Sequence, residues 1–211
     1  MRCIEYADKL KREGWKVLTL EGNILKLYKN NQITEINLDF DTSTKACGTG
    51  IGQSWTSPTN IYASDDAWAS YNIGPLTASQ PLYAYNFGFT LPNATITNIN
   101  VRMERHADYS YIVDGGIQIG LYGGSFYTSK ADTETRWGNT DVTVSYSYTP
   151  VQWGWDGITV EDINNSNFAV KIIAQNINED LYYIASIDYV EIIVTYTPST
   201  PSTIIPQIIF I

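Results

Sequence analysis

The side chains able to carry acid–base or nucleophilic chemistry are few in this chain of 211 residues. His106 is the only histidine, so a Ser–His–Asp or Cys–His site would have to use it. It lies in a polar stretch, residues 104–108, at the end of an expected strand. This position is more typical of a solvated strand end than of a catalytic base. The sequence therefore predicts no catalytic residue and a protein that is not an enzyme.

Paired carboxylates are the remaining route to catalysis, since two acids on either side of a sugar can hydrolyse a glycosidic bond. Asp156 with Glu161 could form such a pair. A chain with 22 acidic residues supplies many such pairs by chance, however. A glycan hydrolase is therefore the third hypothesis, after two that require no catalysis.

Metal ligands are also sparse. Cys3, Cys47 and His106 form no zinc-binding pattern, and the two cysteines could be free thiols or a disulfide. Aspartate oxygens could hold a structural calcium ion between loops, but aspartates in turns usually accept hydrogen bonds from their own backbone. No cofactor is predicted, and a structural calcium ion stays open. The candidate calcium ligands are Asp65, Asp66, Asp114, Asp156 and Asp188.

Aromatic side chains offer binding rather than catalysis, because their faces can stack on sugar rings. The chain has 16 tyrosines and 6 tryptophans, enough to supply both a core and a contact surface. Tyr109, Tyr111 and Tyr127 lie in polar stretches and are the predicted surface-contact aromatics. For the tryptophans the alternative is burial, which we expect for Trp68 and Trp155.

The net charge of −9 narrows the class of partner. A nucleic-acid-binding protein attracts phosphates through a basic surface, and anionic membranes attract proteins in the same way. No apolar run is long enough to insert in a membrane, and the N-terminus lacks the apolar core of a signal peptide. These features predict cytoplasmic synthesis, no nucleic-acid partner and no membrane insertion.

Alternation of apolar and polar residues predicts the elements that would position these side chains. A strand is expected at residues 82–91, where Phe87, Phe89 and Leu91 share one face. Similar runs continue to residue 196, with a turn expected at Asp114-Gly115-Gly116. Short strands at regular spacing, with no amphipathic helix between them, predict a mainly-β protein with an antiparallel, jelly-roll-like β-sandwich.

Changes in composition predict four segments. Residues 1–40 are expected to form a short amphipathic helix and a three-strand meander, because apolar residues at helical spacing precede three short apolar runs with Gly and Asn between them. Residues 41–54 are rich in Gly, Ser and Thr and are expected to be a linker. Residues 55–197 would form the sandwich. Residues 198–211 would form a second linker, rich in Pro, Ser and Thr, and an apolar C-terminal tail.

The apolar tail predicts self-assembly. It combines high β-propensity, bulk and no charge, so it is unfavourable as an exposed end of a free chain. Either it packs on its own domain, or it contacts a neighbouring copy and makes the protein a homo-oligomer. The possible assembly contacts are Ile204, Ile205, Ile208, Ile209, Phe210 and Ile211.

The segment from residue 55 to residue 196 resembles a jelly-roll-like β-sandwich found in structural proteins of tailed phages and archaeal viruses. The resemblance covers about two-thirds of the chain, with its pieces in the same order. These pieces are Trp55–Pro58, Ser64-Asp65-Asp66-Ala67, Phe87-Gly88-Phe89, Leu91-Pro92, residues 94–101, Trp153-Gly154, residues 162–170 and Ile187-Asp188-Tyr189-Val190.

This resemblance implies a non-enzymatic virion protein, such as a capsid, decoration or tail-fibre component. It implies a location on the virion after synthesis in the host cytoplasm, other virion proteins as partners, and a host-surface glycan as a possible ligand. The alternative hypothesis is a carbohydrate-binding β-sandwich module or adhesin, which would use tyrosine and tryptophan at loop ends to grip a glycan.

Overall fold

The computed structural model describes residues 16–21, 24–29, 32–37 and 41–199. The chain forms two compact units. The first consists of Met1–Asp41 together with Thr197–Ile211, and the second is Thr42–Tyr196. In the first unit, β1 (Lys16–Glu21), β2 (Ile24–Lys29) and β3 (Gln32–Asn37) form an antiparallel meander. This confirms the predicted three strands. The expected helix before them lies outside the described residues.

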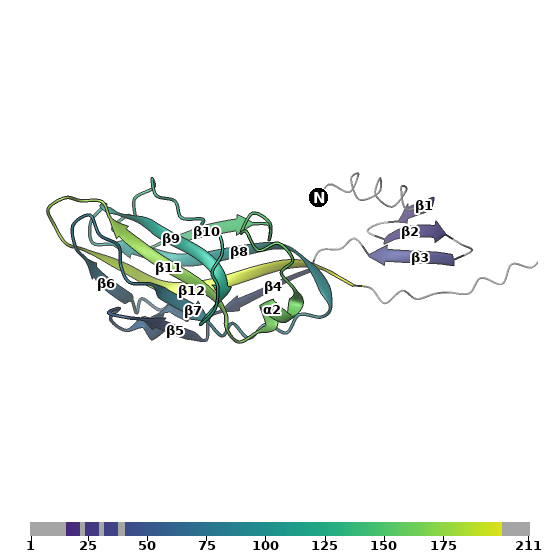
Figure 1. Cartoon of the computed structure of the whole chain (residues 1–211), viewed down its shortest axis with the longest axis horizontal. Helices are drawn as coiled ribbons and strands as arrows, with labels where there is room; N and C mark the ends of the chain where they lie inside the picture. Colours follow the sequence, from purple (N-terminus) through teal and green to yellow (C-terminus); the bar gives the residue numbers. More distant parts are fainter. Residues whose placement is uncertain (1–15, 22–23, 30–31, 38–40, 200–211) are drawn as a thin grey trace, which may run out of the picture. The chain divides into compact units, whose positions relative to one another are not determined.

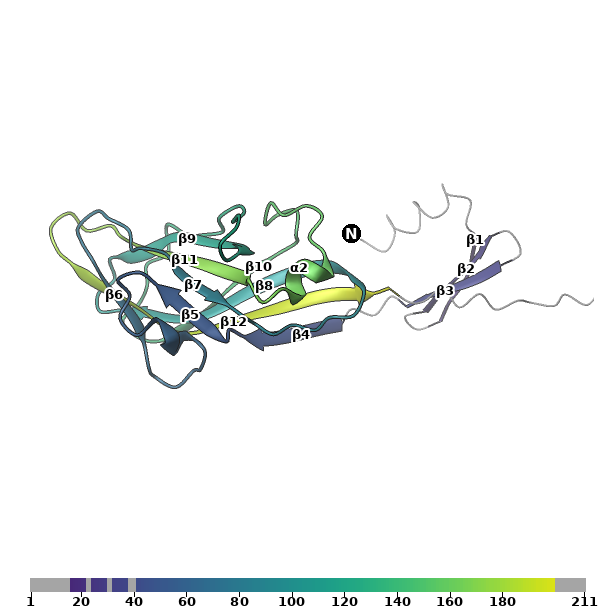
Figure 2. The same cartoon turned by 60° about the horizontal axis from the view of Figure 1, so that its bottom comes forward.

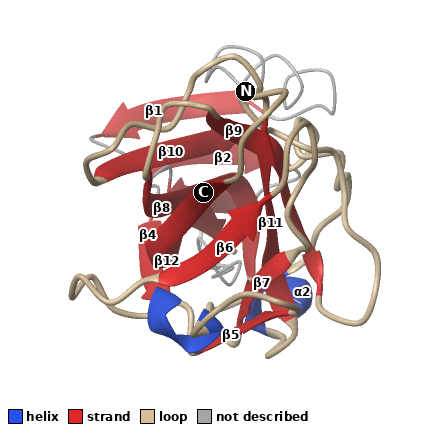
Figure 3. Ribbon diagram, turned by 90° about the vertical axis from the view of Figure 1, so that its left-hand side faces the viewer, coloured by secondary structure: helices blue, strands red, loops and turns tan. Residues whose placement is uncertain are grey.

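The second unit is a sandwich of two antiparallel sheets, seen end-on in Figure 3. Its strands are β4 (Asp41–Ala46), β5 (Thr49–Gly52), β6 (Ala69–Ile73), β7 (Leu82–Tyr85), β8 (Ala94–Ala107), β9 (Ile112–Leu121), β10 (Val142–Tyr148), β11 (Phe168–Asn176) and β12 (Tyr183–Pro198). One sheet has the order β10-β8-β12-β4, with β6 also paired to β12, and the other has the order β5-β7-β11-β9. From β4 to β12, each strand lies in the opposite sheet from the strand before it (Figure 1). This winding confirms the predicted jelly-roll-like sandwich.

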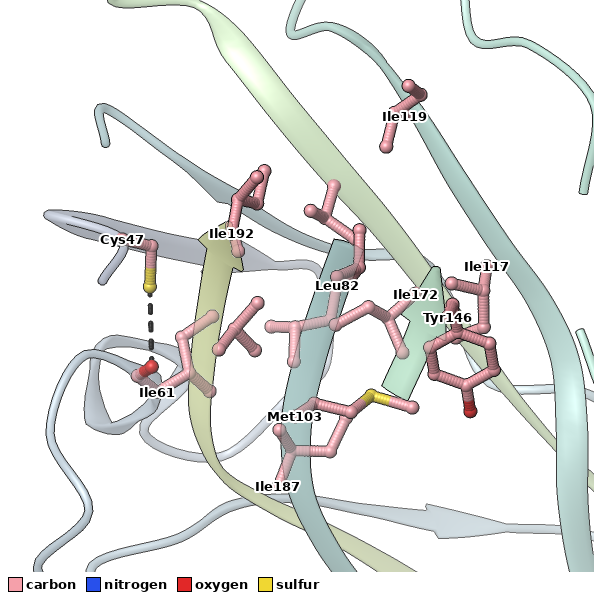
Figure 4. Packing of buried hydrophobic residues seen from close by; sticks show 14 of the residues in the cluster. Cys47, Ile61, Leu82, Met103, Ile117, Ile119, Tyr146, Ile172, Ile187 and Ile192 are labelled. Atoms are coloured by element: carbon pink, nitrogen blue, oxygen red, sulfur yellow. Dashed lines mark hydrogen bonds between the residues drawn. The ribbon is translucent and has the colours of Figure 1, made fainter. Parts of the chain in front are cut away.

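The core lies between the sheets and follows from the alternation of side chains along each strand. Every second residue of β8 from Ile99 to Ala107 is buried, and β11 shows the same period from Val170 to Asn176. Figure 4 shows aliphatic side chains from both sheets meeting in this layer. Each fully buried aliphatic side chain contributes about 1.5–3 kcal/mol of transfer free energy, so this layer is the main stabilising feature.

A short helix, α2 (Val160–Asn164), closes one end of the sandwich (Figure 2). It begins with a capping box, in which Asp162 N–H donates to the Thr159 hydroxyl and Thr159 N–H donates to the Asp162 carboxylate. Asn164 then binds both backbone groups of Leu91, accepting from its N–H at 2.8 Å and donating to its carbonyl at 3.0 Å.

The segment expected to be a linker, residues 41–54, forms strands β4 and β5 instead. Glycine is needed in this segment because neighbouring atoms leave no room for a side chain, and not because the backbone must be flexible. A Cβ atom on Gly50 would lie 1.9 Å from the Pro58 carbonyl oxygen, and one on Gly52 would lie 2.6 Å from the Trp55 ring. The composition suggests a linker because sequence alone does not distinguish glycine needed for contact from glycine needed for flexibility.

Two further local predictions are corrected by the backbone. Asp114-Gly115-Gly116 is not a turn but part of the continuous strand β9, where Gly115 is the extra residue of a β-bulge opposite Ile173 and Ala174. The expected strand of residues 82–91 stops at Tyr85, because Asn86 has a φ of 59° and Gly88 a φ of 67°.

Candidate ligand-binding and assembly surfaces

His106 is engaged in a local contact on β8. Its Nδ1 lies 2.7 Å from an Asp141 carboxylate oxygen, and its ring meets Trp68 edge-on at 4.4 Å between centroids. Within the described residues, no hydrogen bond joins this imidazole to a serine or a cysteine. The arrangement is that of a side chain fixed at a strand end by a carboxylate and an aromatic ring.

Asp114 is the centre of a buried polar network. The β9 bulge places its carboxylate in the core, fully buried, where it pairs with Arg105. It accepts hydrogen bonds from Trp137 Nε1 at 2.9 Å, the Tyr146 hydroxyl at 2.7 Å and the Asp132 N–H at 2.9 Å. Burial raises the pKa of Tyr146 to about 12 and lowers the pKa of Arg105. Protein donors therefore surround this carboxylate, which was one of the candidate calcium ligands.

Asp188 joins β12 to the turn at residues 65–66. Its Oδ2 accepts hydrogen bonds from the N–H groups of Asp65 and Asp66 at 3.1 and 3.2 Å. Its Oδ1 is buried without a protein partner. Burial raises the pKa of Asp188, and the charges of Glu104 and Asp65 raise it further, against the opposing effect of the two N–H groups.

Three of the candidate calcium ligands, Asp65, Asp66 and Asp188, thus come together at this turn. Across the described part of the chain, however, no group of three or more His, Cys, Asp and Glu side chains is arranged to hold a metal ion. A structural calcium ion stays a prediction.

An aromatic groove lies on the outer face of the sheet β5-β7-β11-β9. It is a hollow of about 610 Å³. Strand pairing sets its floor, because Lys171 of β11 lies between Tyr83 of β7 and Gln118 of β9. We use the name aromatic groove for the set Tyr83, Gln118, Tyr122, Gly123, Gly124, Phe126 and Lys171.

Small residues in the neighbouring row make room for the groove. In that row Ala169 lies between Tyr85 and Gly120, and the turn after β9 folds back over Gly120. A Cβ atom on Gly120 would lie 2.3 Å from the Ser125 carbonyl oxygen, so only glycine permits this approach.

The turn brings two aromatic rings to the sheet. Tyr122 stacks on Tyr85 at 4.6 Å and 8°, and it meets Tyr83 edge-on at 5.3 Å. Phe126 lies 5.5 Å from Tyr83, with the Lys171 ammonium 5.7 Å from its ring. The groove therefore presents ring faces and edges beside an amine and an amide, the combination that binds sugars through stacking and hydrogen bonds.

Sequence reasoning missed this groove, although one signal was available. The alternation of Leu82 and Ala84 with Tyr83 and Tyr85 indicates that the two tyrosines share the outer face of a strand. No local pattern indicates that Tyr122 and Phe126 return to the same face, because a turn that folds over Gly120 is a tertiary contact.

A second surface lies at the end of the sandwich where β12 begins, the left-hand end in Figure 1 and the near end in Figure 3. There Tyr111 stacks on Tyr183 at 5.0 Å, Tyr109 lies 5.4 Å from the same ring, and Arg136 lies over Tyr111 at 5.4 Å. Two of the three predicted contact tyrosines thus come together, with Tyr109 61% exposed and Tyr111 37% exposed.

Other loops extend this surface. Leu76 N–H donates to the Asn178 carbonyl, and Ile177 N–H donates to the Tyr111 carbonyl, so three loops converge here. We call the exposed apolar set the end patch: Leu76, Tyr109, Tyr111, Leu181, Tyr182 and Ile184.

The remaining predicted site residues lie elsewhere. Tyr127 stacks on Trp155 at 4.4 Å and 18°, half-buried against the core rather than at a loop tip. The predicted assembly contacts at residues 204–211 lie outside the described residues. None of the described helices has the length and apolar character to span a membrane.

No protein-family model and no curated protein matches the chain. Solved structures are similar in fold. One described as "CBM4 structure and function" has 11% identity over 71% of this chain and 92% of its own, with a TM-score of 0.39. The N-terminal cellulose-binding domain from Cellulomonas fimi β-1,4-glucanase C has 10% identity over 71% and 87%, with a TM-score of 0.36.

A viral structure, that of the infectious bursal disease virus Gx strain, has 11% identity over 89% of this chain with a TM-score of 0.43. The match covers 37% of that viral chain, so this protein spans little more than a third of its length. At identities of 10–11% and TM-scores below 0.5, the likeness does not extend beyond the β-sandwich fold.

Proposed function

We propose that the chain is a non-enzymatic structural component of a virus particle, from a phage or an archaeal virus. In this proposal the particle displays the β-sandwich, and the aromatic groove binds a host-surface glycan. The observation that carries the binding role is the groove itself, in which the rings of Tyr83, Tyr122 and Phe126 line one hollow together with Lys171, whose amine lies 5.7 Å from the Phe126 ring.

The chemistry of the groove favours a sugar over an apolar ligand. An open hollow on a sheet face leaves a ligand partly in water, which suits the hydroxyl groups of a glycan. The tyrosine rings offer stacking faces and hydroxyl groups, while Lys171 and Gln118 add polar groups at the floor. Within the described residues Lys171 forms no ion pair, so its donors are available to a ligand.

The location on a particle is supported by the resemblance of residues 55–196 to virion sandwiches and by the expected assembly through the C-terminal tail. The second candidate is a carbohydrate-binding module or adhesin outside a particle, which would use the same groove. The two differ in self-assembly, because the second has no need of it.

The test is a glycan array probed with the labelled full-length chain, followed by calorimetry with the best ligand. Tyr122→Ala should weaken binding by about tenfold or more, which corresponds to about 1.4 kcal/mol for a lost stacking face. Tyr62→Ala is the control, since Tyr62 is 49% exposed and is not a groove residue. No binding by the parent chain, or unchanged binding by Tyr122→Ala, would overturn the glycan-binding role.

A further inference from the structure

The end patch is the main concentration of exposed apolar side chains on the sandwich. Across the described part of the chain, ten large hydrophobic side chains are exposed, and six of them belong to the end patch. Leu76 is 61% exposed, Leu181 is 57% exposed and Tyr182 is 65% exposed. Such a group on one surface indicates a protein contact, whereas scattered single residues need no explanation.

The backbone at the end patch adds a second observation. Leu76 has a φ of 49°, in the left-handed region that leucine rarely adopts. Asparagine or glycine would fit this conformation better and would remove an exposed apolar side chain. A residue that is unfavourable both in conformation and in exposure is typical of a binding surface.

The length of the chain decides which copy could reach the end patch. Strand β12 begins at the end patch with Tyr183 and runs 16 residues to Pro198, a distance of about 50 Å at the usual rise per residue. The 13 peptide steps from Pro198 to Ile211 span at most about 47 Å when fully extended. Even a tail that ran straight back along its own sandwich would therefore be too short to place the whole apolar segment of residues 204–211 over the end patch, whereas this length does not limit access to the end patch of a second copy.

The distribution of charge also favours residues 204–211 as the segment that binds the end patch. Residues 42–196 carry 6 basic and 15 acidic side chains, which accounts for the whole net charge of −9. Two sandwiches therefore repel each other, and the exposed Asp108, Glu179 and Asp180 place some of this charge near the end patch. Residues 199–211 contain no charged side chain, so they can approach this surface without that cost.

We infer that the end patch of one copy binds the apolar segment of residues 204–211 of a second copy. The contact joins the start of β12 in one sandwich to the chain that follows β12 in the next. It is a head-to-tail contact, which produces a ring if it closes and a filament if it does not. This inference deepens the proposed assembly role and is independent of the groove.

The experiment measures the mass of the full-length chain by light scattering across a range of concentration and salt. The parent should form species larger than 23.7 kDa, and added NaCl should increase association because it screens the repulsion. A tail variant, Ile208→Asp with Ile209→Asp, and a patch variant, Leu76→Asn with Leu181→Asn, should each associate at least tenfold more weakly. Asparagine suits the backbone at position 76, so the patch variant should fold.

Mixing the two variants gives the decisive result. Only the patch variant has an intact tail and only the tail variant has an intact patch, so together they should form a dimer of one copy of each and nothing larger. Val151→Asp is the control, because Val151 is 67% exposed and lies outside the end patch. This control should associate like the parent.

A monomeric parent, a patch variant that associates like the parent, or a mixture that forms no dimer would overturn the inference. Glycan binding by the monomeric variants is measured in parallel and reports on the groove. If the variants lose assembly but still bind the glycan, the result supports the end-patch contact and shows that the groove is intact. Assembly without glycan binding would count against the groove alone.

Discussion

Arg105 of β8 and Asp114 of β9 form a buried ion pair that joins the two sheets of the sandwich. The side chain of Arg105 is 5% exposed, and its guanidinium lies 4.6 Å from the Trp137 ring centroid. Both charged groups of the pair are therefore buried in the core, away from water. A buried pair of this kind is held in place by its hydrogen bonds, and removal of either partner leaves an uncompensated charge.

Asp114→Ala should therefore lower the free energy of unfolding by about 3–5 kcal/mol, because it removes the acceptor for Arg105, Trp137 and Tyr146 together. Arg105→Met should cost a similar amount. The double variant should be less destabilised than the sum of the two, since no unpaired charge remains. Urea unfolding of the four proteins measures this coupling. Additive effects would show that the two side chains act independently.

The pKa of Asp188 predicts a dependence of stability on pH. Because burial raises this pKa in the folded state, the folded protein holds the proton more tightly than the unfolded chain, whose pKa is about 3.9. The contribution of Asp188 to stability is fully present below the unfolded pKa and is lost as pH rises through the folded pKa. Asp188→Asn should remove this loss while keeping an oxygen that accepts from Asp65 and Asp66.

Urea midpoints of the parent and Asp188→Asn, measured from pH 3.5 to pH 8, test this prediction. The difference between the two should move in favour of the variant as pH rises. Asp132, whose pKa is lowered by hydrogen bonds from Thr135, acts in the opposite direction but is common to both proteins. If a calcium ion occupies this turn, added Ca²⁺ should raise the Tm of the parent alone, and the variant should then be the less stable protein at neutral pH.

The thiol of Cys47 should be unreactive in the folded protein. It is 3% exposed, donates a hydrogen bond to the Ile61 carbonyl at 3.3 Å (Figure 4), and burial raises its pKa to about 12. Because the thiolate is the reactive form, a Cys3→Ser variant should react with a thiol reagent at pH 8 only as it unfolds. Stoichiometric reaction within seconds in native buffer would contradict this burial. With urea present, the rate should follow unfolding.

The parts of this fold that could be predicted from sequence are those with a local cause. The alternation in β8 and β10, the three strands of the N-terminal meander and the capping box at Thr159 each depend on neighbours within a few residues. The Arg105–Asp114 pair, in contrast, depends on which strand faces which across the core. The turn over Gly120 is likewise a tertiary contact, so the groove could not be assembled from local patterns.

The glycines of residues 41–54 also depend on tertiary contacts that the sequence does not show, and this can be tested by mutation. Gly50 occupies β5, where an added Cβ atom would lie 1.9 Å from the Pro58 carbonyl oxygen and 2.8 Å from Ile61 Cγ1. Backbone cannot move aside as the end of a long side chain can. Gly50→Ala should therefore lower the free energy of unfolding by about 1–3 kcal/mol, the usual cost of forcing extra volume into a well-packed site.

A true linker would respond in the opposite way, because alanine in place of an unstrained glycine stabilises by about 0.4–1 kcal/mol through the unfolded chain. Gly138→Ala is the matched control. An added Cβ atom there has no neighbour nearer than 3.9 Å, so it should show that small gain. Thermal unfolding of both variants beside the parent gives the comparison. If Gly50→Ala were as stable as Gly138→Ala, the close approach of β5 to Pro58 would be wrong, and residues 41–54 would behave as the linker that their composition suggests.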